Sequence, residues 1–288
     1  MMRRLALALP AVLAACSPTR IAGLLTPRGG TEAREGLRYG PMPRHLLDLT
    51  LPAEVTPATP LVVFAYGGSW RTGTRGEYAF LARVLAARGI AVAVPDYRLW
   101  PEGRWPDFIE DVALATTWLR GEAGRAAGAP AGPLFVMGHS AGGFIAAALT
   151  LDPRWLDAAG MPRATLAGGV LLAAPIRWQP TDEPVRSIFA NAPGGRIDAV
   201  PDAATLREAP PMLLLHGTAD TVVGPFHSVE LARALEAAGR PVRLRLYEGV
   251  GHIGVLSAMA APVRALGLGQ AGVLEEVVGF VSGQQGAA

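Results

Sequence analysis

A serine flanked by two glycines, each two positions away, is the first pattern in this sequence that could perform covalent chemistry. The pentapeptide Gly138-His139-Ser140-Ala141-Gly142 follows the apolar residues 133–137 and precedes the apolar residues 143–149. This order predicts a buried strand, a sharp turn and a helix. A Gly-x-Ser-x-Gly motif in that setting is typical of a nucleophile elbow, where glycines leave room for an exposed serine. The alternative is an ordinary glycine-rich turn, and the strand–turn–helix order favours the nucleophile.

A serine hydroxyl is a weak nucleophile, so this chemistry also needs a general base and an acid that orients the base. Asp220 follows the predicted strand 212–216, and His252 follows the predicted strand 242–247. Both residues therefore lie, like Ser140, in a loop just past the C-terminal end of a strand. In an open parallel sheet these strand ends line one crevice. The sequence thus predicts that Ser140, Asp220 and His252 meet as nucleophile, orienting acid and base.

Several other histidines and acids could take these roles, but each has a more ordinary explanation. We expect His139 to pack or hydrogen-bond beside the sheet, His216 to be a buried residue at the end of its strand, and His227 to lie on a solvated helix surface. Asp198 and Asp202 lie in an irregular segment rather than at a strand end. The order of strands and loops therefore favours the strand-end aspartate as the orienting acid.

The composition excludes several other kinds of chemistry. All 26 Lys+Arg residues are arginine, which excludes a Ser–Lys dyad, a Schiff-base lysine and a P-loop lysine. No group of His or Cys has metal-ligand spacing, so we predict neither a metal nor a cofactor. The formal net charge is only +2 and the arginines are scattered, so we predict no nucleic-acid partner.

The elements that must position these residues alternate along the chain. Apolar strands alternating with helices predict an α/β fold, with a mostly parallel central sheet covered by helices on both faces. The 288 residues are 50% hydrophobic, which is enough for one large core. Strands are predicted at residues 45–51, 61–66, 90–95, 133–137, 168–174, 212–216 and 242–247, and helices at residues 77–88, 106–120, 143–149, 226–238 and 271–281.

Residues 175–211 interrupt this alternation with repeated prolines and mixed charge. The segment follows the strand that comes after the elbow, so it could form a short cap over the crevice. The alternative is a long structural connection, and composition leaves both interpretations open.

The N-terminus predicts export and lipid attachment. The basic residues Arg3 and Arg4 precede an apolar stretch, residues 5–15, that is too short to span a bilayer. The stretch ends in Leu-Ala-Ala-Cys16, which resembles a bacterial lipobox, although an ordinary signal peptide is the alternative. We expect residues 1–15 to be the signal peptide, residues 16–44 a lipidated N-terminus and tether, and residues 45–288 the folded domain. The expected location is the cell envelope, on the periplasmic side of the outer membrane.

Two further motifs carry a resemblance to a known family. The loop Tyr66-Gly67-Gly68-Ser69-Trp70 is similar to a His-Gly-Gly-x-Trp loop, and residues 95–102 resemble an Asp-Tyr-Arg-Leu-x-Pro-Glu segment. Both motifs, and the order Ser, Asp, His, are found in α/β-hydrolases of the carboxylesterase and arylformamidase type, which are related to hormone-sensitive lipase. The resemblance covers about residues 60–255. It implies the α/β-hydrolase fold and hydrolysis of small carboxylic esters through an acyl-enzyme.

This chemistry also requires N–H donors for the oxyanion of the tetrahedral intermediate. Ala141 is expected to supply one donor because it follows the nucleophile. The resemblance implies that Gly68 and Ser69 supply the others. Tyr66 replaces the usual histidine of the loop, and its side chain is expected either to brace the loop through the hydroxyl or to enter the pocket. The resemblance implies a structural role for Asp96 in the turn that follows its strand.

Three functions remain open at this stage. The first is a carboxylesterase for small-molecule esters that is held at the membrane by an N-terminal lipid. The second is an arylformamidase or another amide or peptide hydrolase, which would use the same three residues. The third is a catalytically inactive, lipid-anchored binding protein. The complete set of Ser140, Asp220 and His252 argues against the third function.

Overall fold

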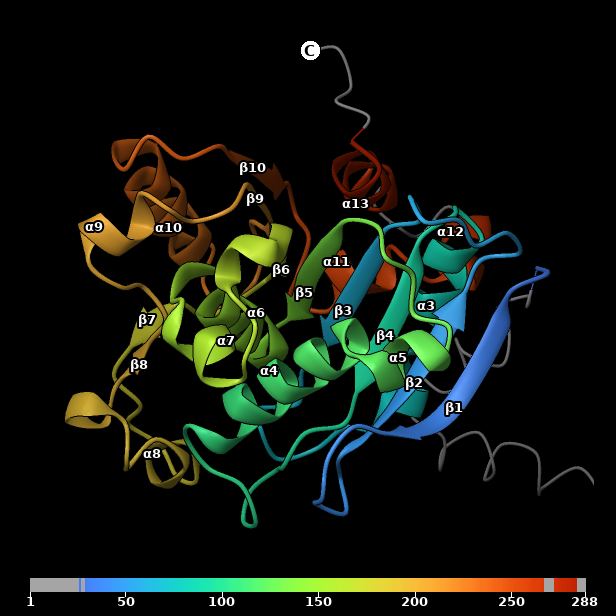
Figure 1. The fold of residues 1–288 in the computed structure, drawn as a ribbon. Coiled ribbons are helices and arrows are strands. Elements are labelled where there is room, and N and C mark those ends of the chain that lie inside the picture. The colour runs from blue at the N-terminus through green and yellow to red at the C-terminus, as the bar shows by residue number, and fades with distance from the viewer. Residues whose placement is uncertain (1–25, 27–28, 267–271, 284–288) are drawn as a thin grey trace, which may run out of the picture.

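The computed structural model describes residue 26, residues 29–266 and residues 272–283. The expected signal peptide, Cys16 and the first part of the expected tether lie outside these described residues. The described chain folds around one central sheet whose strands β3, β4, β5 and β6 run through the middle of the molecule (Figure 1).

The central sheet has eight strands in the order β1-β2-β4-β3-β5-β6-β9-β10. The pairs β1–β2 and β2–β4 are antiparallel, and the other pairs are parallel. This arrangement confirms the predicted α/β fold with a mostly parallel sheet. The strands are β1 (Glu32–Arg38), β2 (Leu46–Leu51), β3 (Leu61–Ala65), β4 (Ala91–Pro95), β5 (Leu134–His139), β6 (Leu166–Leu172), β9 (Met212–Gly217) and β10 (Val242–Tyr247).

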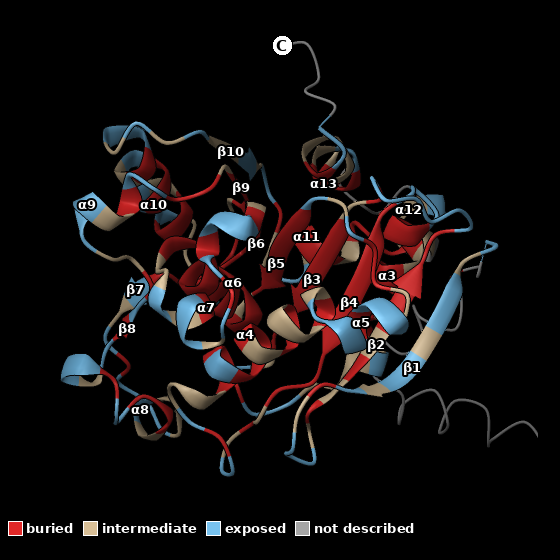
Figure 2. Cartoon of the chain, in the orientation of Figure 1, coloured by how far each residue is buried: buried red, intermediate tan, exposed pale blue. Residues whose placement is uncertain are grey.

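Helices cover both faces of this sheet, which is why β3, β4, β5 and β9 are buried along their whole length (Figure 2). In Figure 1, α4 and α6 lie in front of the sheet, whereas α3 and α11 lie behind it. The helices are η1 (Arg75–Tyr78), α3 (Ala79–Ala86), α4 (Asp107–Arg120), α5 (Glu122–Ala126), α6 (Ala141–Leu151), α7 (Arg154–Ala158), η2 (Arg163–Thr165), α8 (Val185–Ile188), η3 (Pro193–Gly195), α9 (Ala203–Leu206), α10 (Phe226–Ala237), α11 (Gly254–Ser257), α12 (Ala261–Ala265) and α13 (Val273–Val281).

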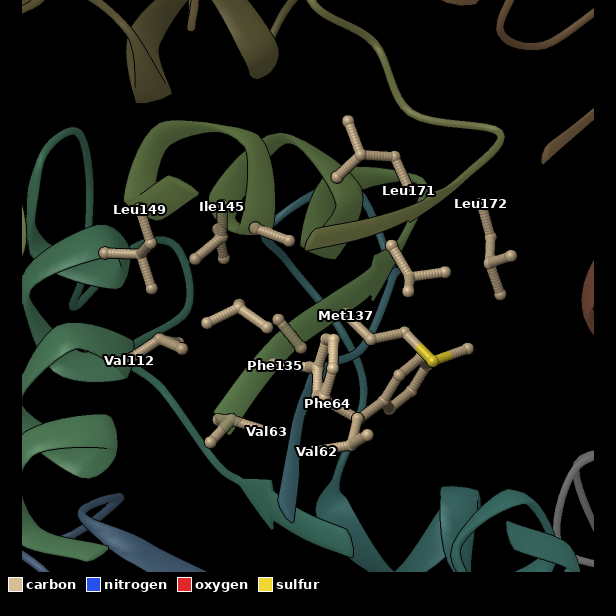
Figure 3. Packing of buried hydrophobic residues seen from close by; sticks show 14 of the residues in the cluster. Val62, Val63, Phe64, Val112, Phe135, Met137, Ile145, Leu149, Leu171 and Leu172 are labelled. Atoms are coloured by element: carbon tan, nitrogen blue, oxygen red, sulfur yellow. The ribbon is translucent and has the colours of Figure 1, made fainter. Parts of the chain in front are cut away.

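The core lies on both sides of β3 and β5. Successive strand residues point to opposite faces, so Val63 lies on the side of Val112 and Leu149, whereas Phe64 and Met137 lie on the other side (Figure 3). All five side chains are fully buried. This packing fixes the C-terminal ends of the central strands, where the predicted site residues lie.

The folded region begins earlier than the sequence predicted. Residues 32–38 form β1, which pairs with β2, although the sequence predicted a tether up to residue 44. Most side chains of β1 are exposed, and Glu32, Arg34 and Arg38 give the strand no apolar alternation. Backbone hydrogen bonds at the sheet edge, rather than burial, hold this strand. Such pairing cannot be predicted from the composition of the segment.

The segment 175–211 forms a small packed insertion. Its strands β7 (Arg177–Trp178) and β8 (Ile197–Asp198) pair with each other, and α8, η3 and α9 complete it. Phe189 is fully buried, with its ring 4.8 Å from the ring of Trp70 and 5.6 Å from that of Phe144. The N–H of Trp105 donates to the carbonyl of Ile188 at 2.9 Å. The insertion is therefore anchored on the helices beside the nucleophile loop.

Candidate active site

Ser140 occupies a strained turn between β5 and α6. Its φ of 54° and ψ of −124° are unusual for a residue with a side chain, and its N–H donates to the Leu172 carbonyl at 3.0 Å. A Cβ on Gly138 would overlap the carbonyl of Gly142, and a Cβ on Gly142 would overlap the carbonyl of Ala65. Lack of space therefore requires both glycines, and the turn holds the serine hydroxyl above the end of the strand.

The structure brings Ser140, His252 and Asp220 into one chain of hydrogen bonds. His252 Nε2 lies 2.9 Å from Ser140 Oγ, and His252 Nδ1 lies 2.7 Å from Asp220 Oδ2. These three side chains come from the loops after β5, β10 and β9, as the sequence predicted. A neutral His252 that donates from Nδ1 to the carboxylate has its Nε2 free to accept the serine proton.

Asp220 is buried and fully hydrogen-bonded. Its Oδ1 accepts from the N–H groups of Val222 and Val223, both at 2.9 Å. Burial alone would raise the pKa of Asp220, but these N–H groups and the His252 ring outweigh burial, so the pKa lies below its ordinary value. Asp220 therefore stays ionised at neutral pH and in a fixed orientation.

A second histidine, His216, supports the same carboxylate. Its Nε2 lies 2.8 Å from the Val223 carbonyl and 3.3 Å from Asp220 Oδ2, while its Nδ1 lies 2.7 Å from Ser228 Oγ. The carbonyl can only accept, so Nε2 carries the proton and the Ser228 hydroxyl donates to Nδ1. Burial lowers the pKa of His216, so it remains neutral. His216 is a buried residue at the end of its strand, as predicted, but its contact with Asp220 is not evident from the sequence.

His139 supports the base from the other side. It is buried, its Nε2 lies 3.1 Å from the carbonyl oxygen of His252, and the two rings lie 4.9 Å apart. The carbonyl can only accept, so His139 donates from Nε2. Burial, aided by the neighbouring His252, lowers the pKa of His139 to about 4. A neutral imidazole therefore holds the backbone of the base in place.

The loop after β3 lies directly against the elbow. A Cβ added to Gly67 would lie 3.1 Å from Ser140 Cβ. Gly68, Ser69 and Trp70 all have positive φ, and the Gly68 carbonyl accepts from the N–H groups of residues 71 and 72. Among the described residues, none accepts a hydrogen bond from the N–H of Gly68, Ser69 or Ala141. These three N–H groups are available to a ligand, which is what an oxyanion site requires.

The Tyr66 side chain braces this loop rather than entering the pocket. It is fully buried, and its ring stacks on Tyr97 at 4.6 Å. The Tyr66 hydroxyl donates to Asp96 Oδ1 and accepts from Arg44 Nη2, both at 2.8 Å. Burial, with a contribution from Asp96, raises the pKa of Tyr66 well above its ordinary value. The structure therefore places Tyr66 in the first of the two roles that the sequence left open.

Asp96 and the neighbouring arginines extend this brace. Asp96 also accepts from the N–H of Arg75 at 2.8 Å and from its Nη1 at 2.6 Å. Arg75 in turn donates to Asp48 at 2.7 Å, which lies on β2. The charged network of Arg44, Tyr66, Asp96, Arg75 and Asp48 thus ties the loop to β2. Asp96 has the structural role that the resemblance implied.

The remaining candidates lie in other settings. Asp198 pairs with Arg177 at 2.9 Å within the insertion, and Asp202 accepts from the N–H of Thr205 at the start of α9. His227 is only 5% exposed, so its expected place on a solvated surface is wrong. Its ring lies 4.1 Å from that of Phe226, which covers it.

Metal-ligand clusters and membrane-spanning helices are both absent from the described residues. These residues contain no group of three or more His, Cys, Asp or Glu side chains that could hold a metal ion. The helices among them lack the combination of length and apolar character that a membrane crossing requires.

Two protein families match this chain. Residues 47–158 match the family described as BD-FAE, and residues 174–265 match the prolyl oligopeptidase family. The first match contains Ser140 and the loop 66–70, and the second contains Asp220 and His252. The two matches together therefore contain Ser140, Asp220, His252 and the loop 66–70.

Curated relatives extend over most of the chain. A probable isoprenylcysteine alpha-carbonyl methylesterase from Oryza sativa subsp. japonica is 31% identical over 265 residues, which are 84% of this chain and 62% of that protein. Esterase LipI from Mycobacterium tuberculosis is 30% identical over 230 residues, 69% of this chain and 68% of that protein. Kynurenine formamidase from Danio rerio is 28% identical over 162 residues, 55% of this chain and 53% of that protein. The chain spans between 50% and 62% of the length of the plant methylesterases that it matches.

Solved structures share the fold. An inhibited form of esterase B from Lactobacillus rhamnosis has a TM-score of 0.71 at 21% sequence identity, and the match covers 96% of each chain. A truncated carbohydrate esterase from gut microbiota has a TM-score of 0.68 at 18% identity and covers 90% of this chain. These similarities extend the match beyond the site to the whole arrangement of the sheet and its helices.

Proposed function

The chain belongs to the esterase family of α/β-hydrolases, and we propose that it is a serine carboxylesterase that hydrolyses small carboxylic esters through an acyl-enzyme. The observation that carries this proposal is the hydrogen-bonded chain from Ser140 Oγ through His252 to Asp220, built on a strained elbow. The free N–H groups beside it provide further support, because an inactive binding protein has no need of them.

In the proposed acylation step, Ser140 Oγ attacks the ester carbonyl carbon while His252 Nε2 takes the serine proton. The 2.9 Å separation of these two atoms allows direct proton transfer. Asp220 keeps Nδ1 protonated and stabilises the imidazolium that forms. The N–H groups of Gly68, Ser69 and Ala141 stabilise the oxyanion.

The tetrahedral intermediate then collapses. The bond from the carbonyl carbon to the alcohol oxygen breaks, and His252 donates its Nε2 proton to the leaving alcohol. The product of this step is an ester between Ser140 and the acyl group. Water then attacks that ester with His252 as the base, which releases the acid and restores the serine hydroxyl.

An amide substrate is a second candidate because the same residues would serve it. The similarity to kynurenine formamidase and the match to the prolyl oligopeptidase family both favour this alternative. A panel of p-nitrophenyl esters and aryl formamides, tested with the same enzyme, separates the two substrate classes. We expect kcat/KM for the esters to be the larger, and a reversed order would make the protein an amidase.

The test of the mechanism is the Ser140→Ala substitution. The variant is expected to lower kcat for p-nitrophenyl acetate and butyrate by a factor on the order of a million, because no other group can form the acyl-enzyme. The matched control is Ser187→Ala, in the insertion, whose hydroxyl donates to Glu183. If Ser140→Ala retained the activity of the control, the proposed mechanism would be wrong.

We also propose that Cys16 carries a lipid and holds the enzyme at the cell envelope, on the periplasmic side of the outer membrane. The support is the sequence of residues 1–16, a basic head and an apolar stretch that end in a lipobox-like Leu-Ala-Ala-Cys. Metabolic labelling with a fatty acid should label the protein and fail to label Cys16→Ser. Equal labelling of the two forms would rule out Cys16 as the lipid site.

A further inference from the structure

Three large apolar side chains are exposed on the chain segments that carry the candidate acid and base, residues 220–226 and 252–253. Val222 is 72% exposed, Ile253 is 59% exposed and Phe226 is 53% exposed. We call these three residues the apolar rim. The other large hydrophobic side chains that are exposed in the described part of the chain are Met42, Val55, Leu246 and Leu266. Exposed apolar side chains on the segments that carry reactive groups are a feature that marks ligand contact.

The hydrogen bonds of Asp220 and His252 hold the backbone next to the rim residues. The N–H of Val222 donates to Asp220 Oδ1 at 2.9 Å, and Ile253 directly follows His252 in the chain. The segment that leads to Phe226 is held at Val223, which donates to Asp220 and accepts from His216. The exposure of these side chains is therefore a property of an ordered surface and does not come from a frayed loop.

The rim also lacks charge. Residues 221–229 and residues 249–263 contain no Asp, Glu, Lys or Arg. The titratable side chains in these two segments are His227 and His252. Burial lowers the pKa of His227, so it is neutral at neutral pH. A substrate group at the rim would therefore meet apolar side chains and no charged side chain from residues 221–229 or 249–263.

The position of the rim indicates which part of an ester it contacts. In the proposed mechanism the leaving alcohol takes its proton from His252 Nε2, so the alcohol oxygen must lie beside His252. The oxyanion loop, by contrast, lies against the elbow through Gly67. The rim residues belong to the chain segments that carry Asp220 and His252 and not to the segment that carries that loop, so we expect the alcohol portion of the ester to pass over them.

On the basis of the proposed function, we infer that the apolar rim of Val222, Phe226 and Ile253 binds the alcohol portion of the substrate and selects esters of apolar alcohols. Each added methylene of the alcohol would be transferred from water to contact with the rim. We expect kcat/KM to rise by about two- to fourfold per methylene until the rim is covered. Esters of methanol or of sugars would gain nothing from this surface.

The test uses two substrate series with the full-length enzyme. The first series varies the alcohol as ethyl, butyl and hexyl acetate, and the second varies the acid as p-nitrophenyl acetate, butyrate and hexanoate. The variants are Val222→Ser, Phe226→Ser and Ile253→Ser, and the control is Val55→Ser. Val55 is another exposed valine, with 45% of its surface exposed, and it precedes β3 at the other end of the sheet.

The wild-type enzyme and Val55→Ser should show the same rise from ethyl to hexyl acetate. The rim variants should reduce the hexyl-to-ethyl ratio of kcat/KM by about fourfold or more, and the acid series should keep its slope. A flat alcohol series in the wild type, or a steep series that the rim variants leave unchanged, would overturn the inference.

Two other outcomes are equally decisive. If the rim variants altered the slope of the acid series instead, the rim would line the acyl side and the inference would be wrong. If they changed only the oligomeric state in light scattering, the rim would be a self-association surface. Failure of the proposed function looks different, because wild type and Ser140→Ala would then hydrolyse both series equally poorly.

Discussion

On the side of the nucleophile, Ser140 and the loop 66–70 are fixed by crowded glycines and by the charged network that runs from Arg44 to Asp48. On the side of the base, Asp220 and His252 are fixed by backbone N–H groups and by the neutral imidazoles of His216 and His139. The supports of the nucleophile side therefore include several opposite charges, whereas the described groups that support Asp220 and His252 are backbone groups and neutral imidazoles. Both sides are held rigid, but by different kinds of groups.

The reason for the difference lies in what each side must do. The nucleophile side has only to hold backbone N–H groups in place, and charged braces below the loop do this without changing the reaction. In the proposed mechanism the base side must let His252 gain and lose a proton. A permanent cation beside Asp220 would compete with the imidazolium for the carboxylate, whereas neutral imidazoles orient the groups without that effect.

The largest expected effect on the base side is that of Asp220→Asn. The substitution keeps the shape of the side chain but removes the charge and allows the wrong tautomer of His252. We expect kcat for p-nitrophenyl butyrate to fall by about 10⁴-fold. Steady-state kinetics measures this loss. The control is Asp198→Asn, which makes the same change at an exposed acid of the insertion. A loss of less than tenfold would mean that another group orients the base.

The second prediction concerns the pH dependence of stability. His139 has a pKa of about 4 in the folded protein and an ordinary value of 6.5, so the unfolded chain binds its proton more readily. His139 therefore costs no stability above pH 6.5, and its cost grows as the pH falls toward 4. At pH 4 this difference in pKa lowers the free energy of unfolding by about 3 kcal/mol. Urea denaturation at several pH values between 7 and 4 measures it.

The variant that isolates this effect is His139→Gln, because the glutamine amide can still donate to the His252 carbonyl but does not titrate. The comparison is between slopes, so a uniform loss of stability in the variant does not disturb it. We expect the unfolding free energy of His139→Gln to depend less on pH between 6.5 and 4. Parallel curves for the two proteins would show that His139 does not have a lowered pKa in the folded protein.

The two sides also differ in how much the sequence predicted. The elbow and its strand were predictable because a tight turn demands glycines at fixed spacing, and spacing is visible in a sequence. The positions of Asp220 and His252 at strand ends were predictable for a similar reason, since parallel strands end at one edge. The mostly parallel sheet followed from the continuous apolar strands.

The supports of the base side were not predictable because they depend on contacts between distant residues. His139 meets the His252 carbonyl across 113 positions of the chain, and no local pattern records that. His227 was expected on the surface because its helix is polar nearby, but the Phe226 and Trp178 rings cover it. The strand β1 was missed because backbone pairing, and not apolar burial, holds it.

The smallest expected effect tests the brace of the nucleophile side, through Tyr66→Phe. The substitution removes the hydroxyl between Arg44 and Asp96 but keeps the ring that stacks on Tyr97. Because Asp96 keeps both bonds from Arg75, we expect a loss of about 1–2 kcal/mol in unfolding free energy and less than a tenfold loss in kcat/KM. Denaturant unfolding and ester kinetics measure the two quantities.

The matched control for this brace is Tyr247→Phe, which removes a buried hydroxyl that has no hydrogen-bond partner among the described residues. Removal of an unpaired hydroxyl should cost nothing, so the difference between the two variants isolates the hydrogen bonds of Tyr66. Equal stability of the two variants would show that ring stacking and glycine packing alone hold the loop. A hundredfold loss of kcat/KM in Tyr66→Phe would show the opposite, because the charged network would then set the positions of the oxyanion N–H groups. In that case the nucleophile side would be as sensitive to its supports as the base side, and the contrast between them would fail.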